Sequence, residues 1–360
     1  MRTDIVAALI RLKKTTKKLQ EVEEELGNIT NSASYKIGRH ITKYIRAIFK
    51  VRETIQTSIG KIKNTGQKKY PTYGNTNANA NATTKKPKNK GATNLKTPNT
   101  NRNSKLIISL TSFPERIDYL YLNLCSLLNQ TLKPDLIYLW LAEDEYPNKE
   151  NNLPQNILNL RDKGLTINWC DNLKSYKKLI YTLKNHPQDL IISADDDIYY
   201  PEKWLELLYI SYLQEPGIIH CHRAHQVKFN DTGNIKSYNE WPDCITTEKT
   251  SYLNFFTTGG GVLFPPETLY KDALNKELFL HLCPTSDDIW FWAMAILNKT
   301  KIKVVDNNIN HITAINPECE DTDTKATTLY QINKTQNDIN IKRLISHYEE
   351  NIIELIMESI

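Results

Sequence analysis

The stretch Leu190-Ile-Ile-Ser-Ala-Asp-Asp-Asp-Ile-Tyr-Tyr-Pro201 holds three consecutive carboxylates between an apolar run and a proline. The run from Leu190 to Ala194 has the length and composition of a buried strand. A proline is suited to the start of a helix, so the aspartates are predicted to occupy a strand-to-helix loop. Adjacent carboxylates repel one another, and the arrangement is costly unless a cation lies among them.

The three aspartates allow two interpretations. They form a site for a hard divalent cation and a diphosphate, at the carboxyl end of a strand where open α/β sheets bind ligands. Alternatively, they form a solvated acidic turn that caps the following helix. The three aspartates fit both interpretations equally well. The segments on either side of them distinguish between the two.

Short apolar runs alternate with helical patterns on both sides of this stretch. Strands are expected at 106–110, 136–141, 165–170 and 190–194, with helices at 119–132, 176–183 and 201–213. This alternation is typical of a parallel α/β sheet. Further along, antiparallel strands are expected at 217–226 and 227–238 around a turn at Asp231 to Gly233, followed by a strand at 255–264, a helix at 286–297, a strand at 302–306 and a helix at 340–360.

Four segments are predicted from composition. Residues 1–63 are expected to form basic amphipathic helices or a coiled coil, since Ile5, Leu12, Leu19 and Leu26 recur every seven residues. Residues 64–104 are rich in Asn, Thr and Lys and are predicted to be a disordered linker. Residues 105–335 form the α/β domain, and residues 336–360 form a C-terminal helix.

Charge is divided unevenly along the chain. Residues 1–104 hold 22 Lys and Arg against 6 Asp and Glu, a net of +16; residues 105–360 hold 24 against 35, a net of −11. A basic segment of this kind favours contact with an anionic surface, and membrane headgroups or nucleic acid could serve. The coiled-coil and amphipathic patterns of residues 1–63 also fit self-association. A solubilising tail, or an ordinary helix packed on the globular domain, remains the alternative.

The remaining composition favours a cytoplasmic protein. The six cysteines are dispersed without a C-x-x-C pair, which is typical of reduced thiols and not of a disulfide framework. No signal peptide and no stretch long enough to span a membrane is recognisable. His220 and His222 share a face of a predicted strand, but no further residue at convincing spacing completes a zinc site.

Four motifs in this order resemble the metal-dependent GT-A glycosyltransferases, in particular bacterial family-2-like enzymes of surface polysaccharide biosynthesis. They are Ser109-Leu-Thr-Ser-Phe-Pro-Glu-Arg-Ile117, Ser193-Ala-Asp-Asp-Asp-Ile-Tyr-Tyr-Pro201, Gly260-Gly-Val-Leu-Phe-Pro-Pro266 and Ser286-Asp-Asp-Ile-Trp-Phe-Trp292. The resemblance covers residues 104–320. It implies a GT-A fold, in which a Rossmann-like nucleotide-binding half is joined to a mixed-sheet acceptor half.

The resemblance implies a metal site on the D-x-D motif. Asp197 would ligate Mn²⁺ or Mg²⁺, Asp195 would hold the ribose or a metal-bound water, and His311 would be a further ligand. Asp196 belongs to the same nucleotide-sugar-binding loop. Because alternate residues of an extended segment face opposite sides, we expect its side chain to point away and to matter least.

The resemblance also implies a catalytic pair, Asp287 and Asp288, at the start of the helix predicted after Ser286. Asp288 would be the general base that takes the proton of the acceptor hydroxyl in an inverting reaction. Since the family often has Glu at the first position, the role of Asp287 stays open. Alternatively, Ser286 and Asp287 merely cap the helix.

Other residues are expected to line the substrate. Nucleotide-sugar contacts are assigned to Thr111, Pro114, Arg116, Asp171 and Lys178, with Lys178 on the diphosphate. The run Gly259, Gly260 and Gly261 would let the backbone approach the donor sugar or the acceptor. Trp290 would stack on a sugar ring, although a tryptophan at helical spacing also fits a core position.

The sequence therefore predicts a metal-dependent glycosyltransferase that moves a sugar from a nucleotide-diphosphate sugar to a glycan or lipid-linked acceptor at the inner face of the cytoplasmic membrane. Lipopolysaccharide, lipooligosaccharide and capsule are the expected acceptor classes. A non-catalytic carbohydrate- or nucleotide-sugar-binding module is one alternative, and a metal-dependent phosphotransferase or nuclease is another. The acidic globular part argues against a nucleic-acid partner.

Overall fold

The computed structural model describes residues 104–246, 249–309, 313–315, 329–348 and 351–358. All of them belong to one compact unit, Thr100–Ile360, which includes the C-terminal helices. The predictions for residues 1–63, for residues 64–103 of the linker and for His311 lie outside the described residues. No helix among the described residues is long and apolar enough to cross a membrane.

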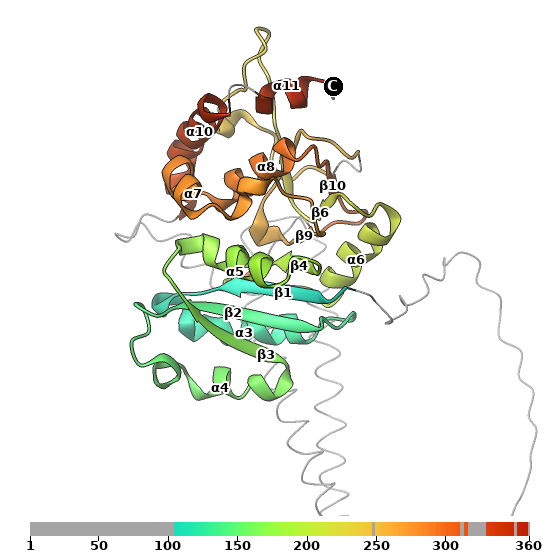
Figure 1. Ribbon diagram of the computed structural model, residues 1–360. Coiled ribbons are helices and arrows are strands. Elements are labelled where there is room, and N and C mark those ends of the chain that lie inside the picture. The colour runs from blue at the N-terminus through green and yellow to red at the C-terminus, as the bar shows by residue number, and fades with distance from the viewer. Residues whose placement is uncertain (1–103, 247–248, 310–312, 316–328, 349–350, 359–360) are drawn as a thin grey trace, which may run out of the picture. The chain divides into compact units, whose positions relative to one another are not determined.

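A seven-stranded sheet forms the centre of this unit, in the order β10-β6-β9-β4-β1-β2-β3 (Figure 1). Its strands are β1 (Leu106–Thr111), β2 (Leu136–Ala142), β3 (Leu165–Cys170), β4 (Leu190–Ser193), β6 (Ile219–Cys221), β9 (Val262–Phe264) and β10 (Ile302–Val304). β9 runs antiparallel to β4 and β6, while the other neighbours are parallel. The predicted α/β class, with a parallel half and a mixed half, is confirmed.

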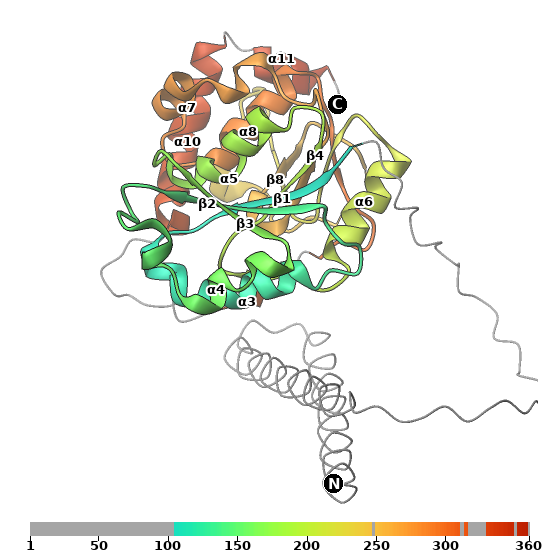
Figure 2. The same cartoon turned by 60° about the horizontal axis from the view of Figure 1, so that its bottom comes forward.

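Helices cover both faces of the parallel half. Figures 1 and 2 show α3 (Ile117–Leu128) and α4 (Gln155–Leu158) on one side of the sheet and α5 (Lys177–Asn185) on the other. β1 and β4 are buried at every apolar position, which explains their continuous Ile and Leu runs. The carboxyl ends of these strands therefore open into loops at one edge of the sheet, including the aspartate loop after β4.

The mixed half differs from its prediction at the glycine run. The single strand expected at 255–264 is two strands, β8 (Asn254–Phe256) and β9, separated by a 3₁₀ turn at Thr258–Gly260. β8 pairs with β7 (Ala224–Gln226) in a separate sheet, and β9 enters the main sheet. The expected hairpin around Asp231 is reduced to one bridge between Phe229 and Ile235.

The remaining elements pack around the mixed half. They are α6 (Trp204–Gln214), α7 (Lys276–Leu282), α8 (Asp287–Leu297), α10 (Leu329–His347), α11 (Asn351–Met357), and the strand pair β5 (Ile198–Tyr199) and β11 (Thr313–Ala314). α8 is almost wholly apolar after its first turn and lies buried between the sheet and the C-terminal helices. Its N-terminus is thereby fixed relative to the sheet.

Candidate active site

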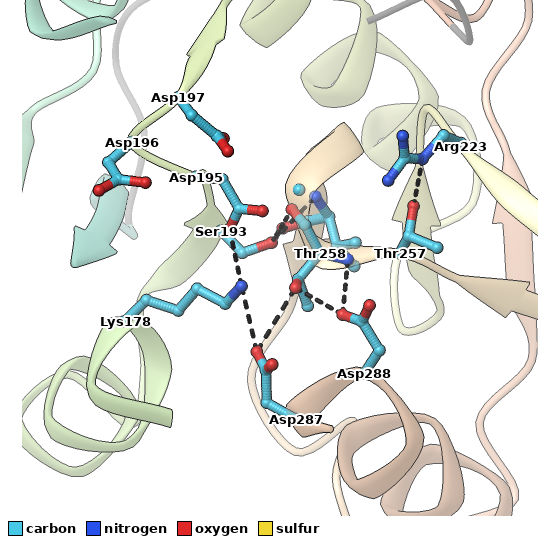
Figure 3. Close-up of polar contacts among 12 residues, drawn as sticks. Lys178, Ser193, Asp195, Asp196, Asp197, Arg223, Thr257, Thr258, Asp287 and Asp288 are labelled. Atoms are coloured by element: carbon cyan, nitrogen blue, oxygen red, sulfur yellow. Dashed lines mark hydrogen bonds and ion pairs between the residues drawn. The ribbon is translucent and has the colours of Figure 1, made fainter. Parts of the chain in front are cut away.

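Asp195 is the first side chain of the aspartate loop and is held by a buried lysine. Lys178, in the first turn of α5, lies with its Nζ 2.7 Å from Asp195 Oδ1. The same Nζ lies 3.1 Å from Asp287 Oδ2 at the start of α8. Burial opposes the charge of Lys178, but Asp195 and Asp287 outweigh it and raise its pKa. One buried cation therefore joins a carboxylate after β4 to one on α8 (Figure 3).

Asp196 and Asp197 share an arginine from the loop after β1. Arg116 Nη1 lies 2.7 Å from Asp196 Oδ1 and 2.8 Å from Asp197 Oδ2. Ser112 Oγ donates to the other oxygen of Asp196 at 2.5 Å. The Asp196 side chain does face away from that of Asp195, as expected (Figure 3). It is nevertheless the most buried of the three and fastens the loop to the end of β1.

The backbone of the aspartate loop is fixed from three directions. Asn123 on α3 donates its side-chain amide to the carbonyls of Asp195 and Ile198, at 2.7 and 2.8 Å. Tyr200 accepts from the Asp195 amide and donates to the Gly259 carbonyl. Ile315, just after β11, donates its amide to the Asp197 carbonyl at 2.7 Å. The carboxylates are thus held on a rigid frame, as a preorganised site requires.

Asp288 lies at the start of α8 and faces a loop from the mixed half. Its Oδ1 accepts the backbone amide of Thr258 at 2.8 Å and the Thr258 hydroxyl at 2.5 Å. Ser286, not an aspartate, caps the helix by accepting from the Ile289 amide. Burial, and then repulsion from Asp287, raise the pKa of Asp288 to about 6. A half-buried carboxylate with a raised pKa is suited to accepting a proton.

Each residue of the glycine run is explained by a neighbour. A Cβ at Gly259 would overlap the Asp195 carboxylate, and one at Gly260 would lie 2.6 Å from Arg223 Cβ. Gly261 has a φ of +101° and would overlap the Trp204 indole. Gly259 therefore lets this backbone lie against the aspartate loop, while Gly260 and Gly261 let it lie against Arg223 and Trp204. Whether they also approach a donor sugar or acceptor stays a prediction.

Four sequence-predicted residues occupy other surroundings. Thr111 ends β1 and donates to the Trp140 carbonyl, and Pro114 begins the 3₁₀ turn Pro114–Arg116. Asp171 follows β3 and forms an exposed ion pair with Lys276. The assignment of Trp290 to sugar stacking is wrong: the ring is fully buried, packs on Phe279 and donates to the Ala273 carbonyl.

The two strand histidines are structural. Ser211 Oγ lies 2.9 Å from His220 Nδ1, and His220 Nε2 donates to the Glu215 carbonyl. His222 accepts from the Ile309 amide and donates to the Trp204 carbonyl. Burial lowers the pKa of both to about 4, so they are neutral near pH 7. With both ring nitrogens of each histidine engaged, the zinc alternative is excluded here.

Sequence reasoning missed two residues of this site. Thr258 holds Asp288, and Arg223, which follows His222, donates from Nε to Thr257 Oγ1. Thr257 and Thr258 stand next to the glycine run, but no local pattern in the sequence indicates that Thr257 bonds Arg223 and Thr258 bonds Asp288. Arg223 lies in the histidine-rich stretch His220 to His225, and no local pattern there distinguishes it from a surface arginine.

The carboxylates fit a hard divalent cation only in combination with a substrate. The side chains of Asp195 and Asp197 are 33% and 37% exposed, and each has one oxygen outside its ion pair with Lys178 or Arg116. No group of three or more His, Cys, Asp or Glu side chains suited to a metal occurs among the described residues. Mg²⁺ and Mn²⁺ are commonly bound by one or two carboxylates together with phosphate oxygens, which this donor set matches.

Two surface grooves in the described part of the chain lie away from these carboxylates. One is lined by residues 234–237 and by the helices α10 and α11, and the other by residues 183–189 and 264–274. Neither includes a residue of the aspartate loop or of the Asp287–Asp288 pair. The candidate site is therefore identified from its cluster of charged side chains and not from either groove.

Comparison with known proteins does not assign this chain to a family. No protein-family model matches the chain, and no curated protein matches it. Among solved structures, it is similar to residues 1–349 of S. aureus TarS, with 16% identity, a TM-score of 0.41 and coverage of 67% of this chain and 72% of that one. The complex of TarS 1–349 with UDP is similar at 16% identity and a TM-score of 0.38, covering 68% and 72%. Similarity at this level carries no functional argument.

Proposed function

We propose that this chain is a metal-dependent glycosyltransferase that moves a sugar from a nucleotide-diphosphate sugar to a glycan acceptor of the cell surface. The observation that carries the proposal is the junction at Lys178. This lysine joins the aspartate loop to the helix start that presents Asp288. The predicted leaving-group site and the predicted base thus lie around one centre, although Asp197 and Asp288 are 91 positions apart in the sequence.

The proposed reaction is a displacement at the anomeric carbon. Asp288 accepts the proton of the acceptor hydroxyl, whose oxygen forms the new bond to that carbon. The bond from the carbon to the diphosphate breaks, and its electron pair leaves with the nucleotide diphosphate. Asp195 and Asp197 would hold Mn²⁺ or Mg²⁺, with His311 as a proposed further ligand, and the bound cation would neutralise charge on the leaving group. Attack opposite to the leaving group makes the reaction inverting.

Thr258 keeps the Asp288 carboxylate in place for this role. Its amide and hydroxyl both donate to Oδ1, which leaves Oδ2 for the acceptor. Arg116 orients Asp197 through its ion pair, and Lys178 orients Asp195. Because the positive charge of Lys178 is shared between Asp195 and Asp287, we assign Lys178 to positioning these groups, in place of the direct diphosphate contact predicted from the sequence.

The test is a screen of nucleotide-sugars with Mn²⁺ that reads the release of UDP, GDP or CMP. We expect the full chain to release one nucleotide, and Asp288→Asn to reduce this by about 10² to 10⁴ while leaving nucleotide binding intact. Asp197→Ala is expected to abolish metal-dependent nucleotide binding. The control is Asp231→Asn, in an exposed turn remote from these residues in sequence.

Absence of turnover with every donor, together with absence of metal-dependent nucleotide binding, would overturn the proposal. Metal-dependent binding without any turnover, unchanged in Asp288→Asn, would instead identify the chain as a nucleotide-sugar-binding module.

A further inference from the structure

Arg223 is held in one conformation by the loop before the glycine run. Its Nε donates to Thr257 Oγ1 at 2.5 Å, and its carbonyl accepts from the Thr257 amide at 3.1 Å. Gly260 leaves no room for a side chain beside Arg223 Cβ. The residue is fixed both at its backbone and at its guanidinium, which reduces the entropy lost when that group binds a ligand.

The guanidinium of Arg223 has unused donors. Among the described residues, no acceptor is bonded to Nη1 or Nη2, and no carboxylate oxygen lies within the 4.0 Å of an ion pair. Figure 3 shows the group turned toward the side on which Asp195 and Asp197 lie. Four N–H donors on a fixed, half-buried cation are therefore directed at the candidate site, and none of them has a partner among the described residues.

The pattern of ion pairs in the site favours binding of an anion beside Arg223. Lys178 and Arg116 are each paired with two carboxylates, whereas Arg223 is paired with none of the described ones. Arg223 acts on Asp195 only at longer range, where it adds to the stronger effect of Lys178 in lowering the pKa of that carboxyl. A cation that only neutralised the negative charge of the carboxylates would not need a fixed orientation. The planar guanidinium, in contrast, presents paired N–H donors that match two oxygens of a phosphate or carboxylate.

We propose that Arg223 binds an oxyanion of a substrate, a phosphate or carboxylate group, in the space that faces the aspartate loop. Thr257 holds Arg223, and the next residue, Thr258, holds Asp288, so one short loop positions both side chains. The inference rests on the proposed function. The oxyanion has two possible sources, namely the diphosphate of the donor or an anionic group on the acceptor, and the experiment below separates them.

The experiment measures anion binding by the full chain with calorimetry. Inorganic pyrophosphate with Mn²⁺ is the probe for the donor diphosphate. Methyl phosphate, added to protein saturated with Mn²⁺ and pyrophosphate, is the probe for an acceptor anion. The variants are Arg223→Gln, which removes the charge, and Arg223→Lys, which keeps the charge but removes the fork. Arg161→Gln is the control, because Arg161 forms an exposed ion pair with Glu150 outside the site.

We expect both Arg223 variants to bind one of the two probes about ten- to hundredfold more weakly, since a hydrogen-bonded charge pair is lost. Weaker pyrophosphate binding assigns Arg223 to the donor, and weaker methyl phosphate binding alone assigns it to the acceptor. Thr257→Val, which frees Nε, is expected to show a smaller loss on the same probe.

Three outcomes overturn the inference. If Arg223→Lys binds both probes like the wild type, the paired N–H donors of the guanidinium are not used, and the inference from their geometry fails. If Arg223→Gln also behaves like the wild type while the wild type binds pyrophosphate, this inference fails and the proposed function stands. A wild-type chain that binds neither probe overturns both. The melting temperature of each variant shows whether a loss of binding comes from a loss of folding.

Discussion

At the scale of single residues, Lys178 has the largest expected effect on stability. Its Nζ forms ion pairs with Asp195 Oδ1 and with Asp287 Oδ2. Among the described residues, no other cation lies within ion-pair distance of either oxygen. Lys178→Met would leave two carboxylates facing each other in a buried place. We expect a loss of about 3 kcal/mol in the free energy of unfolding, measured by urea denaturation at pH 7, because unpairing a buried charge costs this much.

The origin of that loss can be tested with a second substitution. Asp287→Asn in the Lys178→Met background removes one of the two unpaired charges, so the double variant should be more stable than the single one. Lys276→Met is the control, since its ion pair with Asp171 is exposed and should contribute less than about 0.5 kcal/mol. A double variant no more stable than Lys178→Met would attribute the loss to packing alone.

The raised pKa of Asp288 predicts the pH dependence of catalysis. A base works in its ionised form, so nucleotide release should fall as the pH drops through about 6, by about tenfold for each further unit. The Thr258 hydroxyl donates to the ionised carboxylate and favours it. Thr258→Val should therefore move the acid limb of the pH–rate profile to higher pH, and Thr258→Ser should leave it in place. Identical limbs for the wild type and Thr258→Val would contradict the assignment of the base.

Local sequence patterns identified the carboxylates of the site but not the side chains that form hydrogen bonds and ion pairs with them. The aspartate loop and the pair at Asp287 are recognisable because each consists of consecutive carboxylates beside an apolar run. Asp196 was expected to matter least, yet it is bonded by both Ser112 and Arg116. Such partners come from residues 80 or more positions away, and their pairing depends on which strands become neighbours. A pattern within one strand or helix carries no information of that kind.

At the scale of elements, the glycine run decides how the two halves of the sheet join. The segment 255–264 has β-forming residues on both sides of the glycines, and this pattern predicts one strand with the glycines inside it. The positive φ of Gly261 and the turn at Thr258–Gly260 instead send β8 and β9 into different sheets. Glycines permit such a break in a strand but do not predict it. The break depends on the pairing of β8 with β7 and of β9 with β4, and these partners are distant in sequence.

Substituting the glycines one at a time should separate strain from site geometry. Gly261→Ala combines a disfavoured φ with overlap on Trp204 and should cost about 2 kcal/mol or more. Gly233→Ala is a matched control: its φ is +81° but the space around it is open, so only the backbone strain of about 1 kcal/mol is expected. Gly259→Ala should displace the Asp195 carboxylate and weaken binding of Mn²⁺ with pyrophosphate. Equal stability losses for Gly261→Ala and Gly233→Ala would refute the packing argument.

At the scale of the whole molecule, the alternation of strands and helices was enough to predict the parallel half. Strands β1 to β4 lie within a residue or two of their predicted bounds, because continuous apolar runs of this length suit strands buried on both faces. The mixed half was predicted less well. β9 enters between β4 and β6 in the opposite direction, and no periodicity of its three residues indicates that direction.

The uneven charge along the chain leads to the last prediction. Residues 1–104 carry a net charge of +16 against −11 for the rest, so the acidic domain would be repelled by an anionic surface unless the basic part contacts it. We expect the full chain to sediment with vesicles containing anionic phosphatidylglycerol, and not with neutral phosphatidylcholine vesicles. Binding should weaken between 50 mM and 500 mM salt, since screening shortens the reach of surface charges. Deleting residues 1–63, which hold half of this net positive charge, should weaken vesicle binding without affecting binding of Mn²⁺ and pyrophosphate. If the deletion changes neither vesicle binding nor the oligomeric size, residues 1–63 serve neither as a membrane contact nor in self-association.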